Sequence, residues 1–570
     1  MFIMRQGLLT FFIGLAVFLF SLSSHSENKE KALFCRNATT LFTNATFITL
    51  DPKQPLASAV AVSQQRLLAV GDKSILMANC RGKDTQFIDL KGAFVIPGFI
   101  DTHSQFLLYG WLAEYALDLS TTNVFQRPDW HEIKTTDAFL EALKNRAPSY
   151  NGWVIVNGYD PIRIKGTPLD QTMLNNLSSN TPVIVFYSSG NQALLNQAAV
   201  QKIATLSDTK KISIAKSGII RDKSLQLLLT QLIDKENATK AIKNAARFYA
   251  QQGYTTVTEA MVNSVWIPSY ELLTTQSDFP IDVILTPPTI AEKKRMDLTY
   301  QDNPRLYAGP VLIQLDGAAQ DEAAFFTSPS LQHTVSNNNS WPASLKKSPR
   351  ELETILTTSN KEKTPVAIEC NGDAAIDLAL NIIGKVQRSL NSSPFHTIII
   401  NAPFARQDQL QRMQQLGVKV SWFAPHFYYW GNLLCGIVAP SQEGYTGIPL
   451  ASAQKIMNNL SVQANSPSTP PVPLQMIRIL STGETQNWLP ADNQCSKENS
   501  TNEQITLPIA LKALTLDAAL LYGIENDKGS LVPGKLADMT LLSSNPLQAN
   551  DLQKIKVLGT ISRGVLHLNE

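Results

Sequence analysis

The sequence predicts an α/β fold: a (β/α)8 TIM-like barrel joined to a small β domain that is built from both ends of the chain. Eight apolar runs of strand length alternate with helix-like runs, as the buried parallel strands of a barrel do. Both ends of the chain contain short β-rich segments that are broken at polar turns. A long stretch after the first apolar run has apolar segments of its own, which indicates an insertion.

Residues 1–26 have the pattern of a signal peptide. A short start with one arginine precedes an uncharged apolar block over residues 7–22, and Ser24-x-Ser26 then offers an acceptable cleavage site. An uncleaved anchor remains the alternative, although the block is shorter than the roughly 20 residues of a transmembrane helix. We therefore expect an exported protein, periplasmic or secreted, with no stable membrane insertion after cleavage.

The small β domain is predicted from residues 27–93 and 527–570. The first part contains the β-rich segments "ALFCRNATTLFTNATFITLDP" and "ASAVAVSQQRLLAVGD". The second part contains "GSLVPGKLADMTLLSSNPL" and "KVLGTISRGVLHLNE", which have the same character. Segments so alike in pattern at the two ends are expected to share one sheet.

The barrel is predicted to occupy residues 94–526, with the insertion at about 107–250. Runs such as "ATKAIKNAARFYAQQG" and "QDQLQRMQQLG" have helical character, and the insertion carries "WVIVNGYD" and "PVIVFYSS". The eight expected strands are 94–101, 255–259, 281–286, 311–316, 365–369, 397–401, 418–423 and 459–465.

The net charge gives no indication of nucleic-acid binding, and the cysteines suggest disulfide bonds. The 570 residues carry 49 basic and 47 acidic side chains, a net charge of +2, so nothing favours nucleic acid. Five cysteines in an exported chain allow two disulfides. Spacing does not determine the connectivity; from the predicted domains we expect Cys35–Cys80 and Cys435–Cys495, with Cys370 buried and free.

Several stretches resemble stations of the amidohydrolase superfamily, and of amidohydrolase family 3 in particular, the N-substituted formamide deformylase-like branch. They are "FIDLKGAFVIPGFIDTH", "AIECNGDAAID", "SWFAPHFYYWGN", "NSPSTPPVPL" and "ALTLDAALLYGIENDKGSLVPGKLADMTLL". The resemblance implies a barrel whose strand ends hold one or two divalent metals. In such a site the metal activates a water that attacks a C–N bond, and an Asp acts as general base.

The positions that match the family's metal ligands are mostly substituted. The family's His-x-His pair is His103-x-Gln105; residues two apart on a strand point to one side, and here one imidazole is replaced by an amide. Glu369 stands where a histidine is expected, and a carboxylate paired with a cation is its simpler interpretation. Asn401 replaces a further ligand histidine. Leu312 falls on the usual lysine position and is interpreted as core.

Expected charged or basic residues are also replaced by neutral ones at the general-base position and beside it. Asn465 falls on the catalytic Asp, and a neutral amide cannot act as a general base. Gln463 replaces the flanking histidine. His426 is kept near the wall, while Asp373 is expected to be structural after a glycine turn. The remaining pocket positions implied by the resemblance are Asn191, Tyr429, Trp430 and Asn432.

Three hypotheses follow from these substitutions. The first is a degenerate, exported amidohydrolase that retains a polar pocket for an unidentified small ligand. The second is an active hydrolase, either with one atypical metal held by His103 and Glu369, with His426 as an optional third ligand and zinc as the expected ion, or with no metal. The third is a structural or interaction protein with a vestigial pocket. The cofactor is accordingly none or one divalent metal.

Overall fold

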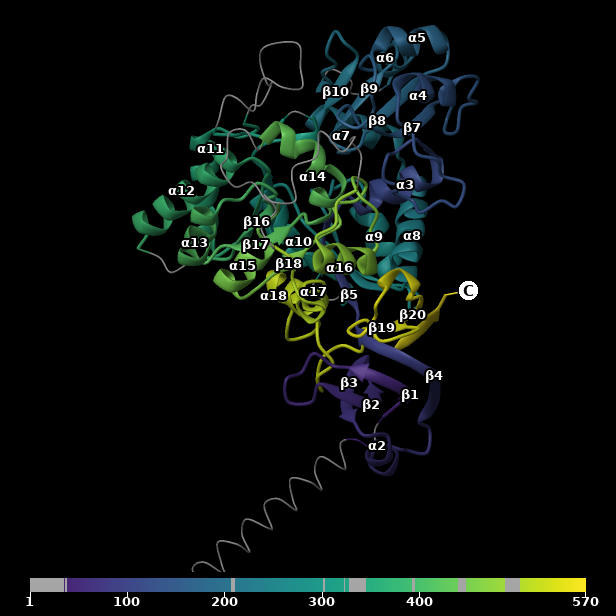
Figure 1. Ribbon diagram of the computed structural model, residues 1–570, viewed down its shortest axis with the longest axis vertical. Helices are drawn as coiled ribbons and strands as arrows, with labels where there is room; N and C mark the ends of the chain where they lie inside the picture. Colours follow the sequence, from purple (N-terminus) through teal and green to yellow (C-terminus); the bar gives the residue numbers. More distant parts are fainter. Residues whose placement is uncertain are drawn as a thin grey trace, which may run out of the picture.

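Eight parallel strands form the barrel at the centre of the computed structural model (Figure 1). The structure describes residues 35, 38–206, 211–300, 303–321, 323–327, 345–391, 395–438, 447–486 and 503–569. The predicted signal peptide lies outside them. The barrel strands are β5 (Phe99–Ser104), β11 (Tyr254–Glu259), β12 (Asp282–Leu285), β14 (Val311–Gln314), β15 (Val366–Cys370), β16 (Thr397–Asn401), β17 (Lys419–Trp422) and β18 (Ser461–Val462). The short β13 (Leu306–Ala308) precedes β14 and pairs with β12.

Two sheets close into the barrel through backbone hydrogen bonds. The strand orders are β13-β12-β11-β5 and β14-β15-β16-β17-β18. On one side Leu312 donates to the carbonyl of Pro287 over 2.9 Å, and on the other Asn465 donates to the carbonyl of His103 over 3.0 Å. The predicted barrel is therefore confirmed, since the two hydrogen bonds join both pairs of sheet edges.

The first barrel strand begins later than predicted. Residues 94–97 belong to β4 (Gln86–Pro97), which lies in a different sheet, and the barrel strand starts at Phe99. Gly98 separates the two strands; a Cβ at this position would lie 2.1 Å from the hydroxyl oxygen of Thr255, so only glycine fits. The prediction was wrong because one apolar run serves two sheets, which periodicity alone does not reveal.

The small β domain is a seven-stranded sheet with the order β21-β20-β19-β4-β1-β2-β3. The first part of the chain supplies β1 (Thr40–Ile48), β2 (Leu56–Ser63), β3 (Arg66–Gly71) and β4. The last part supplies β19 (Met539–Leu542), β20 (Val557–Ser562) and β21 (Val565–Leu568). Strand β4 pairs with β1 on one edge and with β19 on the other, so both ends of the chain share this sheet, as predicted.

A disulfide fixes the short helix of the small domain. Cys35 and Cys80 are bonded, with 4.4 Å between their Cα atoms, and Cys80 caps the C-terminus of α2 (Lys73–Asn79). Cys370 is free and buried. Both predictions are confirmed, whereas Cys495 and the side chain of Cys435 lie outside the described residues.

The insertion forms a five-stranded sheet with the order β10-β9-β8-β7-β6. Its strands are β6 (Leu117–Asp118), β7 (Val154–Tyr159), β8 (Val183–Tyr187), β9 (Gln192–Leu195) and β10 (Ile219–Arg221), accompanied by helices α4 (Thr136–Leu143), α5 (Gln171–Leu177), α6 (Gln197–Ala204) and α7 (Asp222–Leu232). Because it follows the C-terminal end of β5, it lies at that end of the barrel, while the small β domain lies at the other (Figure 1).

Helices cover the outside of the barrel. Helix α3 (Phe106–Tyr115) packs closely on α8 (Lys235–Gln251), because Gly110 leaves room for the carbonyl of Ala241. The other helices are α9 (Ile267–Thr274), α10 (Ile290–Thr299), α11 (Pro349–Glu362), α12 (Asp373–Ser389), α13 (Gln407–Leu416), α14 (Pro425–Val438), α15 (Leu450–Met457), α16 (Pro473–Thr482), α17 (Leu507–Ala513) and α18 (Leu516–Tyr522). Within the described ranges, none is both long and apolar enough to cross a membrane.

A buried group of charges joins the barrel to the small β domain. Asp282, at the start of β12, is fully buried and lies 2.7 Å from Lys528, 2.7 Å from Arg563 and 2.9 Å from Arg305. Asp538 contacts Lys528 from the other side. Burial alone would raise the pKa of Asp282, but the three cations outweigh it and lower the pKa to about 2.

Candidate functional site

The C-terminal ends of the barrel strands bring several predicted site residues together. In barrels of this kind these ends carry the functional groups. His103 lies near the end of β5, Glu369 near the end of β15, and Asn401 ends β16. Gln463 follows β18 directly. All four side chains belong to buried residues, so they form the polar floor of the barrel mouth.

A chain of side-chain hydrogen bonds links three of these positions. Gln463 Nε2 donates to Asn401 Oδ1 over 2.7 Å, and Asn401 Nδ2 donates to Glu369 Oε1 over 3.2 Å. Gln314 Nε2 donates to the second carboxylate oxygen of Glu369 over 3.0 Å. The expected cation partner of Glu369 was wrong: among the described residues two neutral amides, and no Lys or Arg, hold this carboxylate.

The charge of Glu369 acts on His103. Gln105, the expected partner of His103, does not lie on the same strand. Burial lowers the pKa of the His103 imidazole, and the negative charge of Glu369 partly offsets this effect. Strand β5 ends at Ser104, and Gln105 instead occupies the N-cap position of α3, without a side-chain capping hydrogen bond. Its amide nitrogen approaches Gly190 of the insertion, where it would meet a Cβ at 3.0 Å. The strand pattern predicted for this pair was therefore wrong.

Asn465 adjoins His103, whereas Leu312 is core. Asn465 has a left-handed backbone, with φ 52°, and its N–H bonds to the carbonyl of His103. Leu312 is buried in an apolar cluster with Ala367 and Ile398, as expected of a core residue. Asn465, which the resemblance matches to the general base, thus lies at the barrel mouth. Leu312, which it matches to the lysine, belongs to the hydrophobic interior.

His426 lies in an aromatic box, apart from any carboxylate partner. The rings of Phe404, Phe423 and Trp430 are centred 5.6, 5.4 and 5.4 Å from its imidazole. Both ring nitrogens are buried and lack a hydrogen-bond partner among the described residues. Burial lowers the pKa of His426 to about 3, so the imidazole is neutral. The predicted contribution of His426 to a metal site is therefore not supported.

Two pocket residues next to this box are held by specific partners. The indole N–H of Trp430 donates to Asp160 over 2.7 Å. Tyr429 accepts a hydrogen bond from Gln475 over 3.1 Å. Tyr429 also lines a groove of about 730 Å³ between α14, α16, the insertion, the end of α8 and residues 552–557 of the C-terminal part of the chain. His426 and Trp430 are not part of its lining.

The remaining pocket predictions have structural surroundings. Asp373 begins α12, accepts hydrogen bonds from Thr327, and forms an ion pair with Arg406 over 2.8 Å. Its expected structural role is consistent with these contacts. Asn191 lies in the turn between β8 and β9, where its N–H donates to the hydroxyl of Ser189. The side chain of Asn432 lies outside the described residues.

Sequence reasoning missed three polar residues beside Glu369. Gln314 is the last residue of β14, and Asp316 follows it. Asp316 accepts hydrogen bonds from the backbone N–H groups of Asn371 and Gly372, each over 2.8 Å, and burial raises its pKa to about 7. Asn371 also receives a bond from Asn401. Their position at predicted strand ends was the available signal.

Glu259 is a further buried carboxylate at the mouth, and removing its charge should stabilise the protein. It accepts hydrogen bonds from Tyr270 and, over 2.7 Å, from the backbone of Leu107. Burial raises its pKa from 4.5 to about 7. The folded state therefore prefers the protonated form, and stability falls as the pH rises from 4.5 through 7. Glu259→Gln should gain about 1–3 kcal/mol at pH 8 and little at pH 4.5.

Urea unfolding at the two pH values measures this gain. The matched control is Glu236→Gln, which neutralises an exposed carboxylate on α8 and should show no gain that depends on pH. Equal stability of Glu259→Gln and wild type at pH 8 would contradict a charged, desolvated Glu259.

The residues at the barrel mouth do not fit the metal centre that the resemblance implies. In the part of the chain that the structure describes, no three His, Cys, Asp or Glu side chains are placed to hold one metal ion. The mouth instead offers the His103 imidazole, the Glu369 carboxylate, which is already bonded to two amides, and the neutral side chains Asn401 and Gln463. The other two carboxylates described there, Asp316 and Glu259, accept hydrogen bonds from backbone N–H groups. Amide oxygens are hard ligands and suit zinc poorly.

Comparisons with known proteins agree with the fold. The model of amidohydrolase family 3 matches residues 86–566. N-substituted formamide deformylase from Arthrobacter pascens is 23% identical over 92% of this chain and 97% of its own length. Protein LONG AFTER FAR-RED 3 from Arabidopsis thaliana is 23% identical over 89% of this chain and 87% of its own. A metal-dependent hydrolase from Pyrococcus horikoshii superposes with a TM-score of 0.69 at 21% identity, covering 90% of this chain and 98% of that one. The chain therefore belongs to amidohydrolase family 3.

Proposed function

We propose that this protein is an exported member of the family that binds a small polar ligand at the barrel mouth and has lost metal-dependent hydrolysis. The observation that carries the proposal is the hydrogen-bonded chain from Gln463 through Asn401 and Glu369 to Gln314. By the resemblance, Glu369 and Asn401 fall on positions of metal-ligand histidines, and Gln463 falls on the histidine that flanks the general base. Here they bond to one another.

The hydrogen-bonded chain opposes metal binding. Both oxygens of Glu369 accept a hydrogen bond from an amide, so coordination of a metal would compete with two existing interactions. The oxygen of Asn401 is likewise occupied by Gln463. A metal would have to replace these contacts, and among the described residues no three His, Cys, Asp or Glu side chains are placed to hold it.

The position of the general base supports the same conclusion. Asn465 adjoins His103 through its backbone, and its amide has no basic lone pair that could take a proton from water. General-base catalysis contributes roughly 10²–10⁴ in rate. A site without a metal-activated water and without this base is expected to show little hydrolysis.

The polar groups that remain favour a neutral ligand with hydrogen-bonding groups of its own. Gln463 Oε1 is buried and, within the described residues, accepts no hydrogen bond. An acceptor of this kind is costly to bury unless a donor reaches it. A small amide, which carries both N–H and C=O groups, suits the combination of this acceptor with the amides around it.

Two features support export. The apolar block of residues 7–22 has the pattern of a signal peptide. The disulfide between Cys35 and Cys80 is of a kind that persists in oxidising compartments.

The alternative is a hydrolase with one metal bound by His103 and Glu369. The effect of Glu369 on the pKa of His103 favours it, because the two ionisable groups must lie close enough to interact. The two proposals differ in metal content and in the effect of removing the imidazole.

The test is elemental analysis and activity of the purified full chain. After dialysis against a weak chelator we expect well under one zinc per chain, and no turnover of N-formyl or N-acyl amides with added zinc, manganese or cobalt. Titration calorimetry with N-acetylglycinamide, a neutral probe, should detect binding that His103→Ala weakens. The matched control is His131→Ala, which removes an exposed imidazole of the insertion.

One retained metal per chain, together with metal-dependent turnover that His103→Ala abolishes and His131→Ala preserves, would establish the hydrolase instead. Failure of the amide probe to bind wild type would overturn the proposed ligand class.

A further inference from the structure

A second cavity lies at the opposite end of the barrel from the mouth. Its volume is about 530 Å³, within the range of small-molecule sites. Helix α8 forms one wall, the segment that leads into β12 forms another, and β20 and β21 of the small domain form the third. Because α8 and residues 276–280 precede β11 and β12, the cavity lies at the N-terminal end of the barrel strands, away from the barrel mouth. It shares Gln251 and Asn569 with the groove beside Tyr429.

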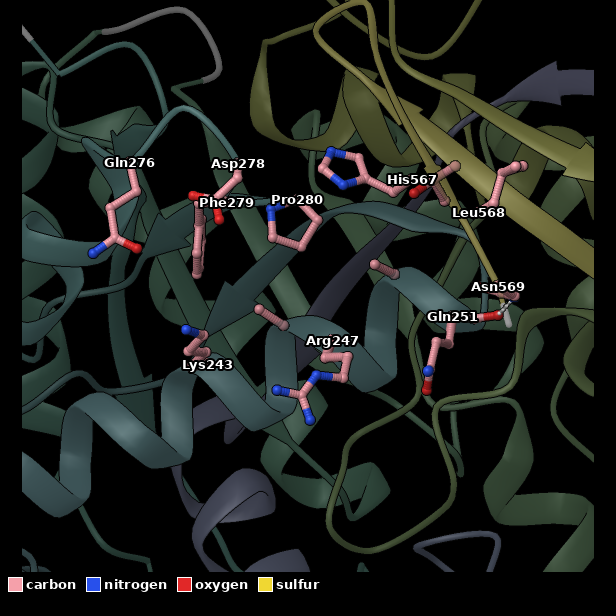
Figure 2. A pocket seen from close by; sticks show the side chains of 13 residues that line it. Lys243, Arg247, Gln251, Gln276, Asp278, Phe279, Pro280, His567, Leu568 and Asn569 are labelled. Carbon is pink, nitrogen blue, oxygen red and sulfur yellow. Dashed lines mark hydrogen bonds between the residues drawn. The ribbon is translucent and has the colours of Figure 1, made fainter.

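The cavity carries an excess of positive charge. Lys243 and Arg247 lie one turn apart on α8 and both line it (Figure 2). Both side chains are exposed, and neither forms an ion pair with any residue in the described part of the chain. The one carboxylate in the lining is Asp278, which is exposed. Two cations against one anion leave a net charge that an anionic group can neutralise.

Hydrogen-bond donors and an orphaned nitrogen add to this charge. His567 reaches the cavity from β21, and its Nε2 is buried without a partner among the described residues. Burial and the nearby Arg305 lower the pKa of His567, and Asp278 partly offsets this effect. The unpartnered Nε2 can share one hydrogen bond with a ligand. Gln251 and Gln276 also line the cavity and offer amide N–H groups.

Apart from Thr560 and Asn569, the rest of the lining is apolar. Phe279 and Pro280 face α8 across the cavity, with Leu568 and two alanines of α8 nearby (Figure 2). A free inorganic ion would leave this surface uncovered. A ligand with a charged head and an apolar body would cover it, while its head meets the guanidinium of Arg247.

We propose that this cavity is a binding site for a small organic carboxylate with an apolar body. Arg247 binds the carboxylate through its planar pair of N–H groups, and Lys243 supplies a second charge one helical turn away. Phe279, Pro280 and Leu568 contact the apolar part. Because the lining comes from both the barrel and the small domain, an occupied site would also hold these two units together.

Titration calorimetry on the full chain tests the proposal with 4-phenylbutyrate as the probe. Saturable binding is expected, and Arg247→Gln and Lys243→Gln should each weaken it by about tenfold. The matched control is Lys235→Gln, which removes the same charge from an exposed position at the start of α8, outside the cavity lining. It should bind the probe as wild type does.

Two further probes distinguish the chemistry. The neutral 4-phenylbutyramide should not bind, since it keeps the apolar body and lacks the charge. Inorganic phosphate should bind more weakly than 4-phenylbutyrate, since it lacks the apolar body. Equal binding of the amide, tighter binding of phosphate, no saturable binding of 4-phenylbutyrate, or an equal loss in Lys235→Gln would each overturn the assignment. Circular dichroism of every variant establishes that it is folded.

Discussion

Asp282→Asn is expected to lower the stability of the protein by about 3–5 kcal/mol, the range found when one partner is removed from a buried ionic group. Asp282 is fully buried and contacts Lys528, Arg563 and Arg305. The variant retains the shape of the side chain but leaves three buried cations with Asp538 as their main counter-charge. Urea unfolding at pH 7, followed by circular dichroism, measures the loss.

The pH dependence of this loss follows from the lowered pKa. The folded pKa of Asp282 is about 2, below its ordinary value of 3.8. Its contribution is therefore complete above pH 3.8 and disappears as the pH falls through 2, so the two proteins should converge at low pH. The control Asp84→Asn removes an exposed carboxylate of the small β domain and should cost little. A loss below about 1 kcal/mol at pH 7 would mean that water reaches these charges.

Removal of the Cys35–Cys80 disulfide is expected to cost about 3–4 kcal/mol. The bridge joins residues 45 positions apart, and a loop of this length loses considerable entropy in the unfolded chain when it is closed. It also anchors α2, which packs beside β2 through the buried Leu76. The double variant Cys35→Ala/Cys80→Ala should unfold at lower urea, and α2 should become more susceptible to trypsin.

Reduction provides the internal control for this prediction. Dithiothreitol should lower the urea midpoint of wild type towards that of the double variant. Any further shift of the double variant on reduction would measure the second predicted bridge, Cys435–Cys495. A wild-type midpoint that is indifferent to reduction would show that the loop is already constrained in the unfolded state.

Much of the barrel could be predicted from sequence because its strands are buried on both faces. A strand such as Thr397–Asn401 is a continuous apolar run, "TIII", that ends in one polar residue. The same continuous apolar character made it impossible to see from the sequence that β4 ends and β5 begins at Gly98. Residues 94–97 and 99–100 are equally apolar, and their assignment to different sheets depends on β19, which lies far along the chain.

For the candidate site, the positions of the residues could be predicted from the sequence, but their hydrogen-bond partners could not. Glu369 and Asn401 could be placed at the mouth because they end predicted strands, and the resemblance gave them expected roles. Their actual partners could not be predicted, since the bonds from Gln314 and Gln463 depend on the register between strands. The surroundings of His426 could be foreseen only in part: Phe423 and Trp430 lie within four residues of it in the chain, whereas Phe404 comes from the segment after β16.

The pairing of β4 with both β1 and β19 has a consequence for biosynthesis. Strands β1–β4 leave the ribosome first, whereas β19, their neighbour in the sheet, is made only after the whole barrel and its insertion. Until then one edge of β4, with the apolar residues Val95 and Ile96, has no partner strand. An unpaired apolar edge of this kind is prone to aggregate. The nascent chain therefore depends on a delayed, long-range pairing, and its yield should be more sensitive to chaperone supply than that of a barrel whose domains fold in sequence order.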